Sequence, residues 1–489
     1  MILFLLFGLA LYEFITAGFP VFAVICLLPV VVLAVIISFR KGMVVFWTLM
    51  LINYFIQWKS FPVQGIPTSL PNEALELLLL AMALINVHEY KFSRCLNLML
   101  GCIIVWCLFC TLEIFNDTCG LGIQAGAWYG GARLMAYQLL YIFLIYTIYI
   151  NKPKLLIQYL YFWGILSIFA AFWVWKQQHI GMTPAETSFL FGRGRTTHVI
   201  NGGTTIRLFS VFCDAANFGI NMAATATAFI VFAIKTKVKK HRRFFLATGL
   251  ICAWAMFPSG TRTAIVCLFA GLGTFVFLSK SVKIAVPVTI VFALAFFMLA
   301  FTNIGQGNAQ IRRMRSAFDK NDASSNQRAI NQETMRKYLG EAPWGIGLGM
   351  GFDNVPANNK FRKMATIAPD SEYVFIWIRT GRYGLTTFLI TTAIMMFGAC
   401  WITVFRIKNN TLQGIAAGLC SAFASIQLGG YGNQVLMQFP NCMLFYGGLA
   451  LVYALPLMEK DWEVYENEKL AEEEEKRRLK LEKKNAKRV

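Results

Sequence analysis

Two carboxylates and two arginines stand at the start of an apolar segment in the last third of the chain, within residues 369–385. Asp370 and Glu372 come directly after a long polar segment, and Arg379 and Arg382 follow them. Ionisable side chains are costly at a membrane-spanning segment unless a substrate or a partner uses them. A carboxylate can take a proton from a hydroxyl group, and an arginine can bind a phosphate through two hydrogen bonds. We therefore expect a reaction or binding site here.

The two carboxylates have several possible roles. Asp370 or Glu372 could act as a general base or as a hydrogen-bond acceptor for a hydroxyl group, with Tyr373 beside them. One short acidic pair without a further cluster of His, Asp or Glu is a weak pattern for a metal site. The structural alternative is that Asp370 caps a helix and Glu372 completes its first turn. The sequence leaves open which carboxylate is the base.

Two arginines further upstream stand in similar polar settings. We expect a helix that starts with Arg207 and buries Asp214 and Asn217 about two turns deeper. Polar groups at that depth need partners, so Asn217 could bind a substrate or only stabilise the fold. Arg262 lies in a very short turn, residues 258–263, which holds the arginine with little slack and suits a contact with an anion.

A glycine-rich segment follows Arg328 and a predicted amphipathic helix. Its glycines alternate with other residues over 345–351. A nucleotide-binding loop would need a strand before it and Lys-Ser or Lys-Thr after it, and the sequence has neither. We predict a tight backbone turn that packs near Asp370 and Glu372.

The composition is that of a protein with many membrane-spanning helices. Of 489 residues, 57% are hydrophobic and 14% are charged, whereas soluble domains have about half apolar and about a quarter charged residues. Apolar runs of roughly 20 residues, long enough to cross a bilayer, occur about fourteen times. The sequence predicts an all-α, polytopic integral membrane protein with about 12–14 transmembrane helices and a large, partly helical outer loop. The runs are 2–18, 20–39, 43–58, 72–88, 95–114, 132–150, 155–175, 209–234, 244–258, 263–279, 284–302, 372–405, 412–430 and 440–457.

Basic residues in every second connection predict the topology. By the positive-inside rule these connections and the tail at 459–489 are cytoplasmic, so both termini lie inside. The two longest connections then face outward with an excess of positive charge. Residues 176–207 hold four basic and one acidic residue, and residues 303–382 hold twelve and seven. This excess favours an anionic ligand such as a lipid phosphate. The alternatives are contacts with lipid headgroups or ion pairs with Asp319, Asp322 and Glu333.

The remaining features suggest a simple division of the chain. Most of the cysteines fall inside apolar runs, which is typical of small core residues rather than of disulfide bridges or metal ligands. The tail holds ten acidic and ten basic residues at spacings of three or four, which predicts a solvated helix or a disordered arm. We expect N-terminal transmembrane helices over 1–206 with an outer loop at 176–206, a second membrane region over 207–458 with an outer loop at 303–369, and the charged cytoplasmic tail at 459–489.

The order of these motifs resembles the bacterial O-antigen ligase and O-antigen polymerase superfamily. The similarity rests on an outer arginine with a following asparagine, a Ser-Gly-x-Arg turn, an arginine before a Pro-x-Gly-x-Gly-x-Gly segment, and a helix with Tyr, then Thr-Gly-x-x-Gly-Leu. It covers roughly residues 207–389, so the second membrane region is the ligase-like part. Family arginines that engage the diphosphate or the reacting sugar map onto Arg207, Arg262 and Arg328.

The resemblance implies a membrane glycosyltransferase of the cell envelope with a mostly helical fold and with no cofactor or metal. Its donor would be a glycan on undecaprenyl diphosphate at the outer face of the bacterial inner (cytoplasmic) membrane, and its acceptor another glycan or a lipid. The bilayer is the other partner, and no nucleic acid is involved.

One motif departs from the family pattern. Ligases of the family usually begin the last motif with His-Asn-x-Tyr, but this chain has Asp370-Ser371-Glu372-Tyr373. A carboxylate can still act as a base, and the departure favours a polymerase or a divergent ligase of surface polysaccharide. His179 and His198, on the outer side, could supply an imidazole instead.

The expected reaction is attack by an acceptor hydroxyl on the anomeric carbon of the donor, with lipid diphosphate as the leaving group. Asp370 or Glu372 would take the proton, and Arg262 and Arg328 would stabilise the leaving group. A flippase or transporter for the same lipid is an alternative, although transporters place ionisable residues near the bilayer midplane in two related halves. A scaffold protein is a third possibility. The expected substrate-binding side chains are Arg207, Asn217, Tyr373, Arg379 and Arg382.

Overall fold

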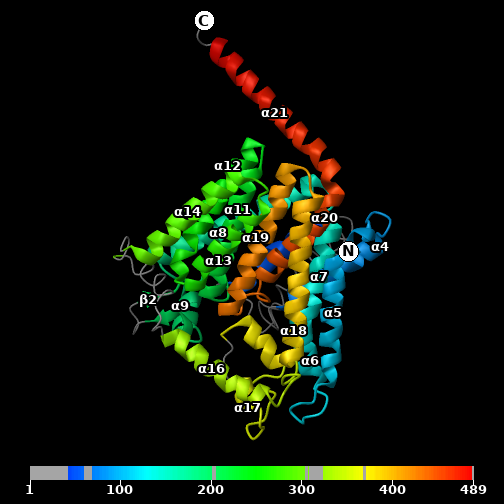
Figure 1. Cartoon of the computed structure of the whole chain (residues 1–489), viewed down its shortest axis with the longest axis vertical. Coiled ribbons are helices and arrows are strands. Elements are labelled where there is room, and N and C mark those ends of the chain that lie inside the picture. Colours follow the sequence, from blue (N-terminus) through cyan, green and yellow to red (C-terminus); the bar gives the residue numbers. More distant parts are fainter. Residues whose placement is uncertain are drawn as a thin grey trace, which may run out of the picture.

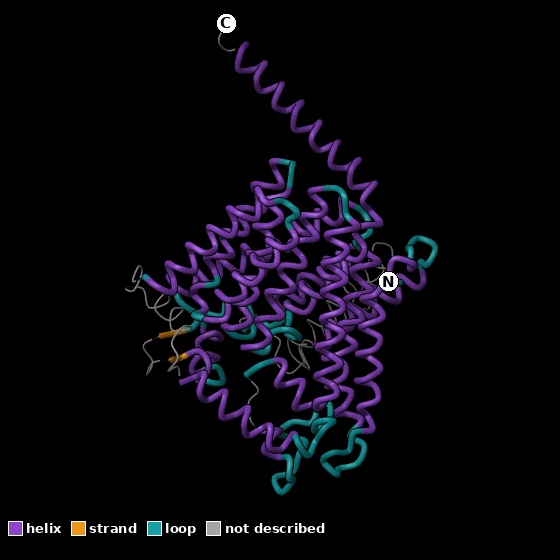
Figure 2. Tube along the Cα trace, in the orientation of Figure 1, coloured by secondary structure: helices purple, strands orange, loops and turns teal. Residues whose placement is uncertain are grey.

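The computed structural model describes residues 42–59, 69–200, 205–302, 307, 323–366 and 370–486. The predicted spans 2–18 and 20–39 and a large part of the outer loop 303–369 therefore lie outside the described residues. In the described ranges the chain is almost entirely helical (Figures 1 and 2), apart from one antiparallel pair of two-residue strands, β1 and β2.

The helices and strands follow in this order: α3 Gly42–Phe55, α4 Ser69–Ile85, η1 Phe92–Cys95, α5 Leu98–Leu112, η2 Glu113–Phe115, α6 Ala125–Ala132, η3 Arg133–Tyr137, α7 Gln138–Tyr149, α8 Pro153–His179, α9 Pro184–Phe191, α10 Arg195–His198, β1 Val199–Ile200, β2 Thr205–Ile206, α11 Ala215–Lys235, α12 Lys239–Ala255, η5 Phe257–Ser259, α13 Arg262–Leu278, α14 Val282–Phe301, α16 Ala323–Leu339, α17 Arg362–Thr366, α18 Glu372–Trp401, η7 Ile402–Arg406, α19 Asn410–Gly432, η8 Cys442–Tyr446, α20 Gly447–Ala454, η9 Leu455–Met458 and α21 Glu459–Ala486.

Seven helices in the described ranges are long and apolar enough to cross a membrane, and two apolar helices, α3 and α13, are shorter. The prediction of an all-α polytopic membrane protein is confirmed. The seven are 98–115, 125–149, 153–179, 215–235, 372–406, 410–432 and the segment that begins at Cys442. The eleven cysteines in the described part are free, and nine of them are buried, as predicted for core residues.

The central helices α11, α12, α13 and α19 pack closely because they carry small residues at their contacts. A Cβ atom on Gly249 of α12 would lie 2.8 Å from a carbon of Ile230, and one on Gly271 of α13 would lie 2.6 Å from Thr227. Helices in a membrane associate largely through such close van der Waals packing. This bundle gives the ends of α11 and α13 a fixed separation, which matters for the polar residues described below.

Two smaller parts lie at opposite ends of the long axis in Figure 1. At one end, α16 and α17 pack with the glycine-rich segment and the first part of α18 around a separate apolar core, which includes Met335, Ile346 and Ile378. At the other end, α21 leaves the bundle. The predicted amphipathic helix after Arg328 is therefore present as α16, with Met335 and Leu339 buried.

The predicted start of the helix after Arg207 is wrong. Helix α11 begins only at Ala215, and Asp214 is its N-cap residue, with its carboxylate accepting the N–H groups of Ala216 at 2.7 Å and Asn217 at 2.8 Å. Aspartate is a favoured N-cap because its side chain satisfies the free N–H groups of the first turn. Arg207 therefore lies outside the helix, in the extended segment that leads to it.

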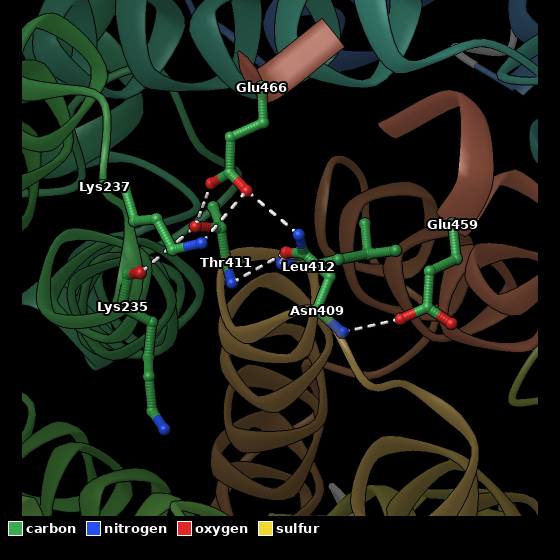
Figure 3. Close-up of polar contacts among 7 residues, drawn as sticks. All are labelled: Lys235, Lys237, Asn409, Thr411, Leu412, Glu459 and Glu466. Carbon is green, nitrogen blue, oxygen red and sulfur yellow. Dashed lines mark hydrogen bonds and ion pairs between the residues drawn. The ribbon is translucent and has the colours of Figure 1, made fainter. Parts of the chain in front are cut away.

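The C-terminal helix α21 is only partly the solvated helix that the sequence predicts. Glu459, Glu466 and Glu473 recur every seven residues on it, so they lie on one face. Oε1 of Glu459 accepts the N–H groups of Lys408 and Asn409, both at 2.6 Å, before α19. Glu466 accepts from the side chains of Asn409 and Thr411 (Figure 3).

Glu473 makes the same kind of contact with the start of α12. Its carboxylate accepts the N–H groups of Lys239 at 3.0 Å and Lys240 at 2.9 Å, where α12 begins. Carboxylates are stabilising at helix N-termini, where unpaired N–H groups and the helix dipole attract negative charge. We call this set of contacts the tail junction. It fastens the first half of α21 to the bundle, while the described residues from Glu474 onward are exposed.

Candidate functional site

The first motif of the sequence analysis lies on a broken helix. Gly381 has φ 64° and ψ −164° inside α18, so the helix is kinked there and its two parts run in different directions (Figure 1). The break frees two carbonyl groups. Ile378 accepts the N–H of Ile346 at 2.9 Å, and Arg379 accepts the N–H of Gly347 at 3.0 Å. The glycine-rich segment is thus attached directly to the short first part of α18.

Glycine is required at these positions by the close approach of the two backbones. Gly345, Gly347 and Gly349 all have positive φ angles, of 75°, 100° and 72°. A Cβ atom on Gly345 would lie 2.5 Å from the backbone nitrogen of Gly381, and one on Gly381 would collide with the carbonyl oxygen of Pro343. The predicted tight turn is confirmed, and its hydrogen bonds hold the backbone at Arg379 in place.

A cavity of about 490 Å³ opens beside the first part of α18. Its walls come from α6, the glycine-rich segment, α18 and the loop after α19, with Gln57 and Ser69 added from the N-terminal helices. Cavities of roughly 300–1,000 Å³ are typical of small-molecule sites. The side chains that line it include Glu372, Phe375, Arg379, Gln434 and Gln438.

Arg379 is a charged side chain of this cavity that lacks hydrogen-bond partners for part of its guanidinium group. Its Nε and Nη1 atoms are buried and have no hydrogen-bond partner among the described residues. The guanidinium lies 5.2 Å from the centre of the Phe375 ring, a cation–π contact that leaves the N–H groups unpaired. A buried charge without a partner is strongly destabilising, so this geometry fits an anionic group that enters the cavity.

Glu372 lies in the same cavity wall but is held by the protein. It is 3% exposed, and its Oε2 accepts the N–H of Leu436 at 2.9 Å. Its neighbours are anchored as well: Ser371 Oγ donates to the carbonyl of Gly430 at 3.0 Å, and the Tyr373 hydroxyl donates to that of Gln427 at 2.8 Å. The N-cap of α18 is Ser371, not Asp370, and the Asp370 side chain is exposed at the mouth of the helix.

The loop after α19, residues 433–441, connects the separate motifs, and the sequence analysis missed it. Asn217 donates to the carbonyl of Gln434 at 3.1 Å, and Asn441 donates to Oδ1 of Asn217 at 3.0 Å. Asn433 donates to Thr263, the neighbour of Arg262, at 3.3 Å. With Leu436 on Glu372, one loop joins α11, α13 and α18. Its Asn, Gln and Pro content between two apolar runs was the available signal.

These contacts also define the place of Asn217. The residue is 1% exposed, and its amide is engaged by the loop, by Asn441 and by Asp214, which accepts from it at 2.7 Å. A second buried bond, from Asn221 to Asn441 at 2.7 Å, continues the same chain of amides. Buried amides with satisfied partners specify one arrangement of their helices, and here they hold the cavity wall against α11.

Arg207 is tied to the short turn between α12 and α13. Its guanidinium donates to the carbonyl groups of Thr197 at 3.0 Å and Ser259 at 3.2 Å, and to Oγ1 of Thr261 at 2.9 Å. The Thr261 hydroxyl in turn donates to the carbonyl of Ala215 at 3.0 Å. Arg207 thus fixes the turn against the start of α11.

The structure distributes the remaining predicted residues over three elements. Arg262 is the first residue of α13, immediately after the short turn, whereas the sequence analysis placed it within that turn. Arg328 belongs to α16. Arg382 is exposed just past the break in α18, where its Nη2 contacts the Tyr383 hydroxyl at 3.1 Å.

His179 and His198 differ in their surroundings. His198 is 1% exposed, with Nδ1 at 2.9 Å from the Gly194 carbonyl and Nε2 accepting the N–H of Ala215 at 3.2 Å. Burial lowers the pKa of His198 below its ordinary value, and the neutral ring fits both bonds. Both nitrogens are engaged in holding α10 to α11. His179 is exposed on the last turn of α8.

Lys59 is a basic residue of this region that the sequence analysis did not select. Its ammonium lies 4.3 Å from the centre of the Phe189 ring. Burial lowers the pKa of Lys59, and the nearby Cys213 and Asp214 oppose that shift. The residue follows α3 in a connection that the predicted topology places outside, so its charge adds to the outer excess.

Residues 244–389 match the protein family described as O-antigen ligase. The match runs from α12 into the long part of α18 and includes the short turn before Arg262, the glycine-rich segment, Glu372 and Arg379. It agrees with the resemblance from the motifs over residues 244–389, whereas Arg207 and Asn217 lie outside the matched residues. A search of curated proteins gave no match.

Proposed function

We propose, from the match of residues 244–389 to the O-antigen ligase family, that this protein transfers or polymerises glycans carried on undecaprenyl diphosphate. A ligase- or polymerase-type function follows from the family. The donor class is supported by one observation in particular: Arg379, inside the matched region, lines a cavity of about 490 Å³ and has two buried nitrogen atoms without a hydrogen-bond partner in the described chain. A diphosphate has the charge and the oxygen atoms that such an arginine binds.

In the proposed reaction an acceptor hydroxyl attacks the anomeric carbon of the donor sugar. A new carbon–oxygen bond forms to the acceptor, the bond to the diphosphate breaks, and the hydroxyl proton passes to a carboxylate. A single displacement of this kind inverts the configuration at the sugar. Arg379 would bind the diphosphate charge, assisted by Arg262 and Arg328 from the surrounding elements, while Arg207 holds the short turn that carries Arg262.

Glu372 is the proposed base because it lines the same cavity as Arg379. Its bond from the Leu436 N–H holds the carboxylate in a fixed orientation. Asp370 is the alternative, since its exposed carboxylate stands two residues away. Glu372→Gln and Asp370→Asn decide between them, because each change removes the base while keeping the shape of the side chain. The base is the residue whose amide variant loses turnover with donor binding intact.

The proposed location is the outer face of a bacterial inner membrane, with both termini in the cytoplasm. The positive-inside pattern of most connections supports it. The excess of arginine and lysine in the two long connections runs against that pattern, and an anionic ligand at that face would account for it. The acceptor would be a second glycan or a lipid at that face. Arg382 and Tyr373, at the two sides of the break in α18, are proposed to border the path of the acceptor.

The test is turnover of a lipid-linked oligosaccharide by purified protein in liposomes, with product length read on a gel. Arg379→Ala should lower turnover by about 10²–10³-fold, the loss typical of one removed transition-state donor. Arg336→Ala is the matched control, because this arginine is exposed on α16 and does not line the cavity. Equal activity of Arg379→Ala and wild type would remove the proposed role. Intact donor that only changes leaflet would identify a flippase instead.

A further inference from the structure

A second cavity, of about 340 Å³, lies at the tail junction, between α21, the start of α12 and the first turns of α8. In Figure 1 these elements stand at the end of the molecule that is opposite α16 and α17. Besides two carboxylates of α21, the polar side chains that line the cavity are Tyr161, Lys240, His241, Tyr465, Lys469 and Lys476.

The positive charges of this cavity are only partly balanced. Glu472 and Glu473 also line it, but Glu472 pairs with Lys469 at 2.5 Å and Glu473 accepts the backbone N–H groups at the start of α12. The ammonium groups of Lys240 and Lys476 form no ion pair with a carboxylate of the described chain. Two positive charges therefore face the same space from two different helices.

His241 adds an unsatisfied hydrogen-bonding group. The side chain is 8% exposed, and its Nδ1 lies 2.8 Å from the Tyr161 hydroxyl. In the tautomer in which Tyr161 donates that bond, Nε2 carries the proton. Nε2 is buried and has no partner among the described residues, and His241 is one of the residues that line the cavity. A buried donor without an acceptor costs free energy unless a ligand supplies one.

We propose that this cavity binds a phosphate group, carried either by an anionic lipid headgroup or by a soluble phosphate ester. Lys240 and Lys476 supply the charge, and Nε2 of His241 donates to a phosphate oxygen. The volume is that of a small-ligand site. Because half of the lining belongs to α21, the bound phosphate bridges α21 to α12 and α8 and holds the C-terminal helix on the bundle.

The experiment measures hydrogen exchange of the α21 residues 462–476 in full-length protein reconstituted in phosphatidylcholine nanodiscs. One arm adds phosphatidylglycerol to the bilayer, and the other adds glycerol 1-phosphate to the buffer. We expect slower exchange in at least one arm. Lys240→Ala/Lys476→Ala should raise the probe concentration needed for half-maximal protection on the order of tenfold or more, as expected for two lysines near phosphate.

The matched control is Lys480→Ala/Lys483→Ala, which removes two exposed lysines from the same helix beyond the cavity. This variant should keep the wild-type response. Protection by lipid alone assigns the phosphate to a headgroup, and protection by glycerol 1-phosphate assigns it to a soluble ester. Each result supports the site when the cavity variant loses it. The proposal is overturned if neither probe protects the wild type, or if the control loses as much protection as the cavity variant.

Discussion

Glu372 and Glu466 are both 3% exposed, and the comparison of their surroundings separates a candidate active site from a structural junction. Glu466 is surrounded by protein donors, namely Asn409 at 2.9 Å, Thr411, and Lys237 at 3.5 Å (Figure 3). Glu372 receives a backbone N–H on one side and borders a large cavity on the other. Burial of a carboxylate alone therefore does not mark function.

The difference lies in what remains unsatisfied nearby. Beside Glu372, Arg379 keeps two buried nitrogen atoms without a partner in the described chain. At the tail junction, the groups that contact Glu466 belong to the helix ends themselves, and each contact closes a bond that the fold needs. An empty space next to an unpaired charge is the feature that points to a ligand.

The largest expected effect on stability is at the tail junction. Glu466→Ala should lower the free energy of unfolding by about 2–4 kcal/mol, because Asn409 and Thr411 lose their buried acceptor. Glycan transfer per folded molecule should remain, since the change lies far from the cavity of α18. Thermal denaturation in detergent measures the first quantity, and a transfer assay at low temperature measures the second.

Glu468→Ala is the control for this change, because Glu468 is exposed two residues further along α21. It should leave the melting temperature nearly unchanged. If Glu466→Ala abolished transfer in protein that is still folded, the division between a structural end and a reactive end would be lost.

The next effect concerns the break in α18. Gly381→Ala should cost about 1–3 kcal/mol from backbone strain alone, because φ 64° with ψ −164° suits only glycine. The added Cβ also collides with Pro343, so the glycine-rich segment should detach from α18 and glycan transfer should fall. Hydrogen exchange of residues 345–351 reports the detachment directly.

Gly273→Ala is the matched control, because a Cβ at this helical glycine has open space around it. Wild-type transfer in Gly381→Ala would show that the attachment of the glycine-rich segment to α18 is not needed for the site.

The sequence predicts the local parts of this site better than their assembly. The alternating glycines and the short turn before Arg262 are recognisable because their conformations depend on a few neighbouring residues. Glu372, however, bonds to Leu436, and Asn217 bonds to Asn441, both in the loop after α19. No periodicity or spacing reveals which loop closes on which helix end.

The C-terminal tail also shows that local sequence patterns do not reveal tertiary contacts. Opposite charges three or four apart favour pairs within one helix, and Lys469 with Glu472 is such a pair. The seven-residue recurrence of Glu459, Glu466 and Glu473 places them on one face of the helix. The contacts of that face depend on which helix ends pack against it. Partner choice is a tertiary property, so the tail could not be assigned a docking role from the sequence.

A smaller effect on stability should appear when the pH is changed, in the segment that contains His198. Because burial lowers the pKa of His198 in the folded protein, the unfolded segment binds a proton more readily, and stability falls as the pH drops below about 6.5. Nearby Arg207 and Lys59 oppose protonation, and Asp214 favours it. Hydrogen exchange of residues 195–200 should therefore rise between pH 7.5 and 5.5, after correction for intrinsic rates.

His198→Gln should remove this dependence, whereas His179→Gln should keep it, because His179 is exposed. An unchanged exchange rate across this pH range in the wild type would contradict a neutral His198 ring with a hydrogen bond at each nitrogen.

The smallest expected effect separates the three glutamates of the tail junction from one another. Glu473→Gln keeps one acceptor oxygen for the N–H groups of Lys239 and Lys240, replaces the other oxygen with an NH2 donor and removes the charge, so it should cost on the order of 1 kcal/mol at this partly exposed helix N-terminus. Amide exchange at the start of α12 should rise by a few-fold with added salt having little further influence, whereas the wild type should become more open as salt screens the charge. Glu474→Gln, at the exposed neighbouring position, should change neither. A loss as large as that of Glu466→Ala would mean that Glu473 is part of the buried network rather than a partly exposed cap, and the first half of α21 would then be one continuous structural element.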